Sequence, residues 1–332
     1  MLILSGDIGG TTTRLQLSNA NHGKLNIIGH EQYSNAEFDS LNTIMVKFLK
    51  HFKTKTMDVN RCCLAVAGPI INNTVKFTNL PWFVDAAEIK TELGITNVAL
   101  INDFQAIGYG IETLTTEDVI TLQKGKPNAT EPKAIIGAGT GLGVGIMHHD
   151  GKQYNVLATE GGHVDFAPTD DEQVQLLLYL RNKFRRVSTE RVVSGIGLTN
   201  IYKFVRDTPT LGEKEHPKLK LALYKSDDIG STIAEFAIQH QDSMALRALS
   251  LFIRAYGSAA GNLALTTLCF GGLYLVGGIA PKLLAQLKQP TFINAFSDKG
   301  RMSKLIKDIP IYVVLNTRVG LQGAAVYASR HA

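Results

Sequence analysis

The chain has 332 residues, of which 45% are hydrophobic and 19% are charged, and its formal net charge at pH 7 is +5. This length exceeds what one hydrophobic core usually serves, so we expect two globular domains of ordinary size. The net charge is small, and the basic clusters at 183–186 and 218–225 are isolated from each other. The composition therefore argues against a nucleic-acid-binding protein, which needs a continuous basic surface.

Three features of the sequence indicate a cytoplasmic protein that does not contact a membrane. Asp7 interrupts the only apolar stretch near the N-terminus, so we expect no signal peptide. Residues 255–281 carry no charge, but six glycines, Asn262 and Pro281 interrupt them, which predicts a buried helix followed by a strand rather than a membrane span. The three cysteines, of which Cys62 and Cys63 are adjacent, are expected to be core residues in a reducing compartment.

The first third of the chain predicts three strands followed by alternating helices and strands. Seven apolar residues recur at helical spacing between 38 and 52, and Asp85 and Gly94 supply the start and stop signals of a short helix. In chain order, we expect strands at 2–6, 14–18 and 24–33, a helix within 38–52, strands at 61–70 and 75–79, a helix between 85 and 94, and a strand at 97–103 that ends on Asn102 and Asp103.

The remainder of the chain begins with the same pattern. Residues 133–162 read as three strands joined by turns, helices dominate 171–265, and a further buried strand precedes a Gly-Gly turn within 273–281. A hairpin with a glycine- and threonine-rich turn thus occurs twice, at 3–18 and at 134–148. The repeat predicts two related α/β domains that place both turns against one ligand in a cleft between them.

The two turns have the composition of phosphate-binding loops, because glycine lets backbone N–H groups close on phosphate oxygens and threonine adds neutral donors. Neither a P-loop motif nor G-x-G-x-x-G is present, which excludes the common nucleotide fingerprints. Asp7 cannot bind phosphate, but its carboxylate can hold Mg²⁺ against a nucleotide, directly or through water. The residues predicted for this site are Gly6, Asp7, Ile8, Gly9, Gly10 and Thr11 in the first turn, and Gly139, Thr140 and Gly141 in the second.

Six segments together resemble the bacterial-type ATP-dependent glucokinase family of the actin/hexokinase/Hsp70 fold superfamily. In order, they are "GDIGGTTTR", "INDF", "GAGTGLG", "EGGHVDFAP", "ERVVSG" and "LVGGIAP". The resemblance runs from residue 5 to about residue 325 and implies two RNase H-like (actin/hexokinase-type) domains, a small one at 1–112 plus 308–332 and a large one at 113–307. The sugar repressor and kinase family of the same fold is a poorer match, since its members normally carry a zinc-binding cysteine cluster just after this motif and "EGGHVDFAPTDDEQ" contains no cysteine.

The resemblance implies an activity and its ligands. The enzyme would transfer the γ-phosphate of ATP to the 6-hydroxyl of glucose, giving glucose 6-phosphate and ADP in the first step of glycolysis. It would use Mg²⁺ and act as a cytoplasmic homodimer. Gly277 and Gly278 match the family's turn on the adenosine side of the nucleotide, although a glycine pair of this kind also serves helix packing.

Asp103 ends a buried strand, where it could accept a proton from a hydroxyl or simply cap the next helix. Glu160 and His163 could likewise belong to a solvated loop or to a metal site. The resemblance implies that Asp103 is the catalytic base. The sugar ligands that it implies are Gly68, Asn79, Asn102, Asp103, Glu160, His163 and Glu190.

Two other functions remain open on the sequence. One is a kinase of another hexose, such as mannose, fructose or glucosamine. The other is an actin-class filament or sensor that hydrolyses ATP without a sugar, which would leave Asn102, Glu160, His163 and Glu190 without a role. Measuring ATP consumption across hexoses and without sugar separates the three.

Overall fold

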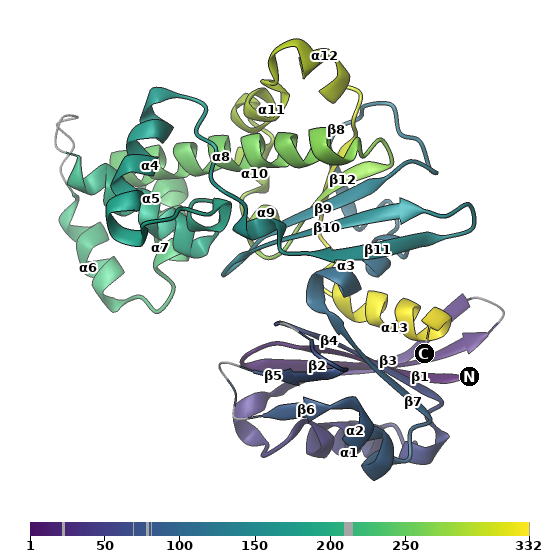
Figure 1. Cartoon of the computed structure of the whole chain (residues 1–332). Coiled ribbons are helices and arrows are strands. Elements are labelled where there is room, and N and C mark those ends of the chain that lie inside the picture. The colour runs from purple at the N-terminus through teal and green to yellow at the C-terminus, as the bar shows by residue number, and fades with distance from the viewer. Residues whose placement is uncertain (22–23, 69, 78–79, 81, 209–214, 332) are drawn as a thin grey trace. The chain divides into compact units, whose positions relative to one another are not determined.

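The computed structural model describes residues 1–21, 24–68, 70–77, 80, 82–208 and 215–331. They form two compact units (Figure 1). The first unit consists of residues 1–117, 154–158 and 316–332, and the second of residues 118–153 and 159–315.

The first unit is built on a five-stranded mixed sheet with the strand order β3-β2-β1-β4-β7. The first three strands form an antiparallel meander, and β1, β4 and β7 run parallel. The strands are β1 (Leu2–Ile8), β2 (Thr12–Asn21), β3 (Lys24–Ser34), β4 (Arg61–Val66) and β7 (Asn97–Asn102), with a separate small hairpin of β5 (Thr74–Lys76) and β6 (Phe83–Asp85). The predicted opening hairpin is confirmed, and its strands extend beyond the predicted bounds.

Helices cover both faces of this sheet because side chains along each strand point alternately to its two sides. Residues such as Leu4 and Leu15 pack with α1 (Leu41–His51) and α2 (Ala86–Leu93), whereas Ile3 and Ala65 pack with α3 (Asp103–Ile111) and α13 (Val319–His331). The predicted caps of α2 are confirmed, since Asp85 accepts from Ala87 N and Gly94 is left-handed. Two short 3-10 turns, η1 (Asn35–Glu37) and η2 (Thr56–Asp58), complete the unit.

Helices α3 and α13 are in backbone contact. A Cβ atom at Gly110 would lie 1.9 Å from the carbonyl oxygen of Val319, and one at Gly323 would lie 1.8 Å from that of Ala106. Only glycine fits at these positions, because a larger residue would push the helices apart. The contact fixes α3 against α13 and thereby positions Asp103, the first residue of α3.

The second unit is built on a six-stranded mixed sheet with the order β11-β10-β9-β12-β13-β8, although residues 154–158 of the edge strand β11 are counted with the first unit. Its first five strands repeat the order of the other sheet, with a meander next to parallel strands, so the predicted repeat is confirmed. The strands are β8 (Val119–Gln123), β9 (Lys133–Ala138), β10 (Leu142–His149), β11 (Tyr154–Thr159), β12 (Gly272–Val276) and β13 (Ile311–Val314). Two mixed sheets with flanking helices confirm the predicted α/β class.

A 25-residue helix, α8 (Ser243–Thr267), packs on the second sheet, and the other helices surround it (Figure 1). The other helices of the unit are α4 (Asp171–Phe184), α5 (Gly195–Asp207), α6 (Pro217–Lys225), α7 (Ile229–Gln239), α9 (Ile279–Lys282), α10 (Leu284–Leu287), α11 (Pro290–Ser297) and α12 (Ser303–Ile306), with the 3-10 turns η3 (Gly161–His163), η4 (Thr189–Arg191) and η6 (Gly300–Met302).

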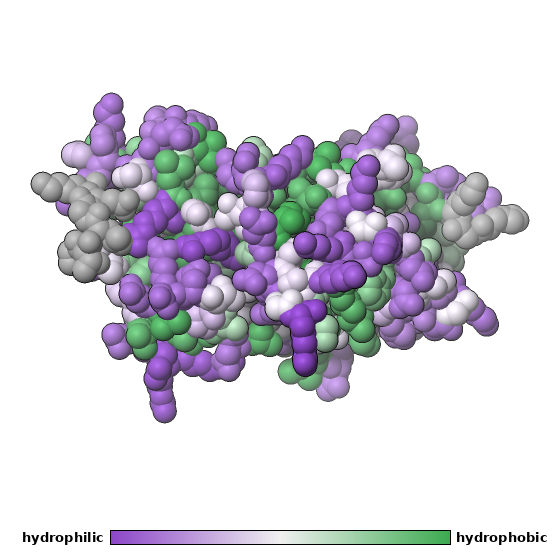
Figure 2. Space-filling view, turned by 90° about the horizontal axis from the view of Figure 1, so that it is seen from above, coloured by the Kyte–Doolittle hydropathy of each residue, from purple (hydrophilic) through white to green (hydrophobic). Residues whose placement is uncertain are grey.

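The uncharged segment at 255–281 forms the end of α8 and then β12, as predicted. Among the described residues, no helix has both the length and the apolar character that crossing a membrane requires. Figure 2 shows hydrophilic side chains spread over one face of the molecule, with separate hydrophobic patches between them. The three cysteines are buried and unbridged, which confirms their prediction as core residues.

Candidate active site

The carboxyl ends of three parallel strands bring part of the predicted site to one edge of the first sheet. Ile8 pairs with Val66, and Val66 pairs with Asn102, so β1, β4 and β7 end level with one another. Gly9 and Gly68 lie in the loops that follow β1 and β4, and Asp103 directly follows β7 as the first residue of α3. This edge is where open α/β sheets place ligands.

Asp7 lies at the start of this edge and faces Arg14 across the hairpin. The two residues pair in register, and Arg14 Nη1 lies 3.4 Å from Asp7 Oδ2. Burial raises the pKa of the Asp7 carboxyl above its ordinary value, and the opposing effect of the neighbouring guanidinium is smaller. Among the described residues, no group of three or more acidic, histidine or cysteine side chains could hold a metal ion. A single carboxylate nevertheless fits Mg²⁺, which usually takes one or two protein carboxylates together with substrate phosphates.

A buried asparagine holds the first glycine turn in shape. Asn35, which is 2% exposed, donates from Nδ2 to the Gly9 carbonyl oxygen at 2.9 Å and accepts at Oδ1 from the Thr13 hydroxyl at 2.7 Å. Its backbone N–H donates to the Thr11 carbonyl oxygen at 2.9 Å. Sequence reasoning missed this residue, because a lone asparagine after a strand indicates only a turn.

The start of α3 shows how far Asp103 serves as a helix cap. The N-cap of this helix is Asn102, whose Oδ1 accepts from Phe104 N at 2.9 Å and from Gln105 N at 3.3 Å. Asp103 is the first helical residue, and its Oδ1 also accepts from Phe104 N, at 2.9 Å. The cap therefore does not require Asp103, so its place at the sheet edge is open to a functional reading.

The other predicted sugar ligands of this unit are Gly68 and Asn79. Gly68 is exposed with φ of +125°, a conformation that residues with a side chain rarely adopt. Asn79 lies outside the described residues.

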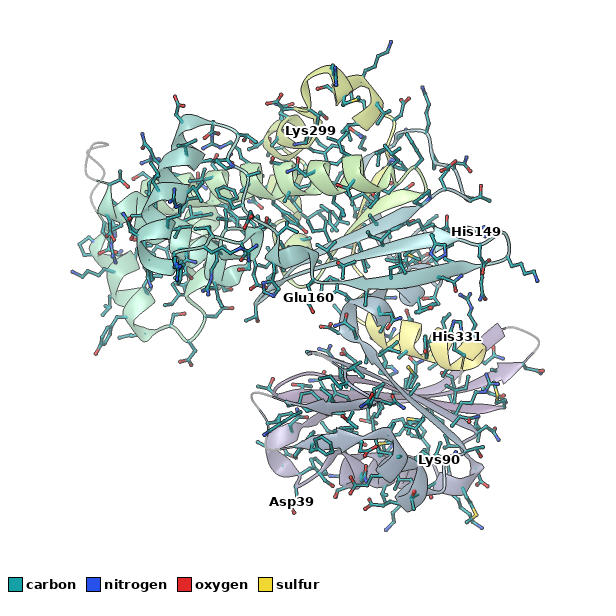
Figure 3. The ribbon with its side chains drawn as sticks, viewed as in Figure 1. Asp39, Lys90, His149, Glu160, Lys299 and His331 are labelled. Carbon is teal, nitrogen blue, oxygen red and sulfur yellow. The ribbon has the colours of Figure 1, made fainter. Side chains whose placement is uncertain are left out.

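The second unit brings Glu160, His163 and Glu190 together. His163 Nε2 lies 3.8 Å from Glu160 Oε2, and His163 Nδ1 lies 3.9 Å from Glu190 Oε1. The Glu160 side chain is 81% exposed and projects from the end of β11 (Figure 3). Two carboxylates around an imidazole offer several hydrogen-bond acceptors at close spacing, which suits a ligand with neighbouring hydroxyl groups.

Glu190 also contacts the second glycine turn. Its Oε2 atom accepts from the Leu142 backbone N–H at 2.9 Å, and a Cβ atom at Gly141 would lie 2.5 Å from the same oxygen. In addition, Gly195 N donates to the Gly139 carbonyl oxygen at 2.8 Å. The segment that carries Glu190 thus holds the turn at 139–141 in place.

The third glycine turn lies at the same edge of the second sheet. Val276 at the end of β12 pairs with Gly137 of β9, which places Gly277 beside the end of β9. Gly277 has φ of +84°, and a Cβ atom there would lie 2.8 Å from the Ala138 carbonyl oxygen. In the described part of the chain, no heavy atom beyond the adjoining residues lies within 4 Å of where a Cβ would stand at Gly139 or Gly278. Local packing therefore does not explain these two glycines, whereas close approach of a ligand would.

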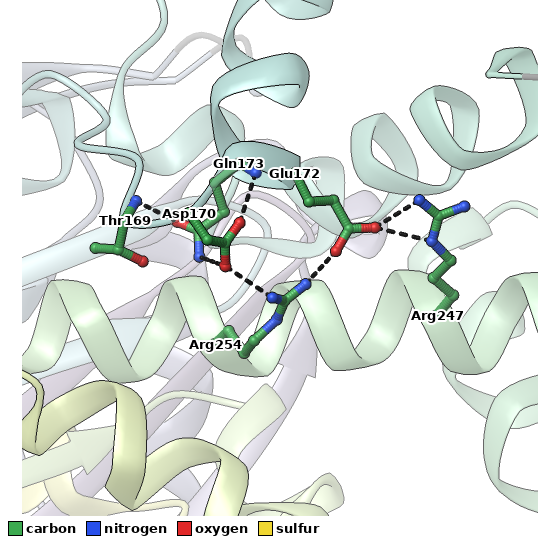
Figure 4. Close-up of polar contacts among 6 residues, drawn as sticks. All are labelled: Thr169, Asp170, Glu172, Gln173, Arg247 and Arg254. Carbon is green, nitrogen blue, oxygen red and sulfur yellow. Dashed lines mark hydrogen bonds and ion pairs between the residues drawn. The ribbon is translucent and has the colours of Figure 1, made fainter. Parts of the chain in front are cut away.

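The loop that follows His163 is anchored at its far end by two arginines of α8. Arg254 bonds Asp170 at 2.7 Å and also Glu172, and Arg247 bonds Glu172 at 2.6 Å (Figure 4). Asp170 is also the N-cap of α4, accepting from Gln173 N. These ion pairs fix the start of α4 on α8 and so limit the freedom of the loop at 164–169.

Comparison with known proteins assigns these motifs to one family. The family profile described as Glucokinase matches residues 4–331. The chain belongs to the glucokinase family. It is 46% identical over 340 residues to the glucokinase of Nostoc punctiforme, with 99% of each chain covered. The predicted family is therefore confirmed.

Solved structures of this family and of its fold relatives agree. A crystal structure of a glucokinase from an Antarctic psychrotroph superposes with a TM-score of 0.86 at 31% identity and covers 99% of this chain and 98% of that one. A ROK family glucokinase from Streptomyces griseus, solved with glucose and AMPPNP, has a TM-score of 0.61 at 19% identity, with 99% of this chain and 100% of that one covered. The second likeness shows the shared fold alone.

Proposed function

We propose that Asp103 is the general base in the phosphorylation of glucose by ATP, the reaction of this ATP-dependent glucokinase. The observation that carries the proposal is the level ending of β1, β4 and β7, which sets the Asp103 carboxylate on the same sheet edge as the Gly9–Thr11 turn. A hydroxyl that attacks phosphorus must lose its proton, and a carboxylate within hydrogen-bond reach accepts it.

In the proposed chemical step, Asp103 is the only residue that takes up a proton. The 6-hydroxyl oxygen of glucose forms a bond to the γ-phosphorus, the bond from that phosphorus to the bridging oxygen of ADP breaks, and the hydroxyl proton passes to Asp103. Because phosphoryl transfer has a loose transition state, most of the rate comes from alignment of the reactants and from neutralisation of charge.

Glucose is held in this proposal by the side chains that the sequence predicts as its ligands. Glu160, His163 and Glu190 accept and donate toward its hydroxyls, and their clustering within 3.8–3.9 Å supports the assignment. Asn102 contributes amide N–H groups, since its carbonyl oxygen already accepts from the α3 backbone. Gly68 and Asn79 complete the set.

The nucleotide phosphates bind the two glycine turns. The residues assigned are Gly6, Asp7, Ile8, Gly9, Gly10, Thr11, Gly139, Thr140 and Gly141, with Gly277 and Gly278 on the adenosine side. Asp7 would hold Mg²⁺, which neutralises charge on the phosphate oxygens when it is bound. The open space beside Gly139 and Gly278 supports this assignment.

We further propose that the small domain comprises 1–112 plus 308–332 and the large domain 113–307. The boundaries between the two compact units, which lie near residues 117 and 316, support these bounds. The protein is proposed to act in the cytoplasm, which its three unbridged cysteines support. Separating cell fractions and assaying glucose phosphorylation in each would test the location.

The protein is also proposed to be a homodimer. An apolar pocket of about 260 Å³ lies in the second unit, and its lining includes Ala259 and Leu263 of the uncharged segment together with Val164, which is 57% exposed. A second copy would bury this surface. Sedimentation at micromolar concentration tests the proposal, because a single species of 36.1 kDa would contradict it.

The experiment that tests the function measures ADP formation with glucose, mannose, fructose, glucosamine and no sugar. We expect the highest kcat/KM with glucose and almost no turnover without sugar. A higher kcat/KM with another hexose would mean that glucose is not the preferred substrate. ATP hydrolysis without sugar at the rate seen with glucose would contradict the kinase assignment.

A further inference from the structure

In the second unit, a short antiparallel pairing joins the segment that follows His163 to the segment that precedes Glu190; we call the segments that carry Glu160, His163 and Glu190 the sugar motifs. Thr189 N donates to the Val164 carbonyl oxygen at 2.8 Å, and Phe166 N donates to the Val187 carbonyl oxygen at 3.0 Å. Asp165 and Ser188 face each other between these bonds. The pairing begins one residue after His163 and ends one residue before Glu190, so it sets the distance between those two side chains.

The Arg186 side chain reaches from the Val187 end of this pairing back to His163. Its Nη2 atom donates to the His163 carbonyl oxygen at 2.8 Å and lies 2.8 Å from Asp165 Oδ1. From sequence, the basic cluster at 183–186 reads as a solvated surface. The structure places the last member of that cluster on the backbone of a predicted sugar ligand.

The carbonyl group that Arg186 holds belongs to the backbone from which the His163 imidazole projects. His163 ends the 3-10 turn η3, and the chain becomes extended at Val164, with φ of −63° and ψ of 159°. The imidazole lies between two carboxylates, 3.8 Å from one and 3.9 Å from the other. A small shift of the backbone at His163 would therefore change both distances at once.

The exposure of Arg186 makes a role in overall stability a poor explanation. Its side chain is 62% exposed and that of Asp165 is 78% exposed, and ion pairs in such positions contribute little to folding. The bond to the His163 carbonyl is exposed as well, but its effect is local, because a charged donor on a backbone acceptor restrains one peptide group.

We propose that Arg186 is a positioning residue for glucose binding, which restrains the His163 peptide so that the imidazole stays between Glu160 and Glu190. The proposal rests on the proposed function, in which His163 binds the sugar. Arg186 itself contacts no substrate in this account. Its loss should weaken glucose binding and leave nucleotide binding and the chemical step nearly unchanged.

The test compares Arg186→Gln with Arg185→Gln, a matched control that removes the same charge one residue away, at another exposed position. We expect Arg186→Gln to raise the dissociation constant for glucose, measured by calorimetry without ATP, by about tenfold, and Arg185→Gln to change it by less than about twofold. The KM for ATP and kcat at saturating glucose should stay within about twofold in both variants.

Two further variants separate the two contacts of Arg186. Arg186→Lys keeps the charge but cannot reproduce the planar guanidinium, so we expect an intermediate loss of about threefold. Asp165→Asn removes the ion pair and keeps the bond to His163, so it should weaken glucose binding by less than Arg186→Gln. The double variant should bind glucose no more weakly than Arg186→Gln alone.

His163→Ala, measured in parallel, distinguishes failure of this proposal from failure of the proposed function. If His163→Ala leaves glucose binding unchanged, His163 is not a sugar ligand and the proposed function is wrong at this residue. If His163→Ala weakens binding but Arg186→Gln matches Arg185→Gln, the positioning role alone is overturned. It is also overturned if Arg186→Gln lowers the melting temperature and raises the KM values for glucose and ATP together.

Discussion

Replacing Asn35 with alanine should damage the nucleotide turn and leave the sugar motifs intact. The change removes the donor to the Gly9 carbonyl oxygen and the acceptor of the Thr13 hydroxyl, which is fully buried. Two lost hydrogen bonds at about 1 kcal/mol each, with a buried hydroxyl left without its acceptor, amount to about 2–4 kcal/mol of unfolding free energy. For a unit of this size the melting temperature should fall by about 5–15 °C.

A double-mutant cycle isolates the bond between Asn35 and Thr13. Thr13→Val removes the stranded hydroxyl, so the double variant should be less destabilised than the sum of the two single variants, by about 1 kcal/mol. Chemical denaturation of the four proteins measures this difference.

Kinetics at a temperature where the Asn35→Ala variant is folded test the effect on function. The KM for ATP should rise severalfold, while the dissociation constant for glucose stays within about twofold. An unchanged KM for ATP, together with additive stability losses, would refute the reasoning and leave Asn35 as an ordinary buried residue.

Two other predictions concern the site, and a third concerns the buried cysteines. Valine at Thr11 or Thr140 keeps the β-branched shape and removes one donor, so the KM for ATP should rise about 5- to 30-fold, and unchanged values in both variants would return the turns to a structural role. The dissociation constant for glucose, measured by calorimetry, should increase from the wild type through Glu160→Gln to Glu160→Ala, because glutamine keeps a weaker acceptor and alanine keeps none. An equal affinity in all three proteins would mean that Glu160 does not bind the sugar. Burial raises the pKa of Cys62 to about 12 and that of Cys269 to about 11. These thiols should therefore not react with Ellman's reagent at pH 8 until denaturant is added, and rapid labelling of the native protein would contradict their burial.

The parts of the fold that could be predicted are those encoded by local sequence. The opening hairpin follows from alternating side chains on either side of Gly9 and Gly10, and the bounds of α2 follow from a cap at Asp85 and a stop at Gly94. The repeated strand order could be anticipated because the same hairpin signal occurs twice.

The contacts that shape the site were less accessible from sequence, because they join residues distant along the chain. Asn35 reaches back 26 positions to Gly9, and Arg186 reaches back 23 positions to His163. Neither residue type marks such a partner by itself. The N-cap of α3 is likewise Asn102 and not Asp103. The two adjacent residues have nearly equal capping tendency, so the backbone geometry decides which side chain meets the free N–H groups.

The central claim is that Asp103 accepts the proton of the attacking hydroxyl, and Asp103→Asn tests it most directly. Asparagine can still hydrogen-bond the hydroxyl but cannot take its proton, so glucose should bind with nearly the affinity of the wild type, as measured by calorimetry. The kcat for glucose phosphorylation should fall by roughly 10²- to 10⁴-fold. A variant that binds glucose and turns over at close to the wild-type kcat would contradict the account.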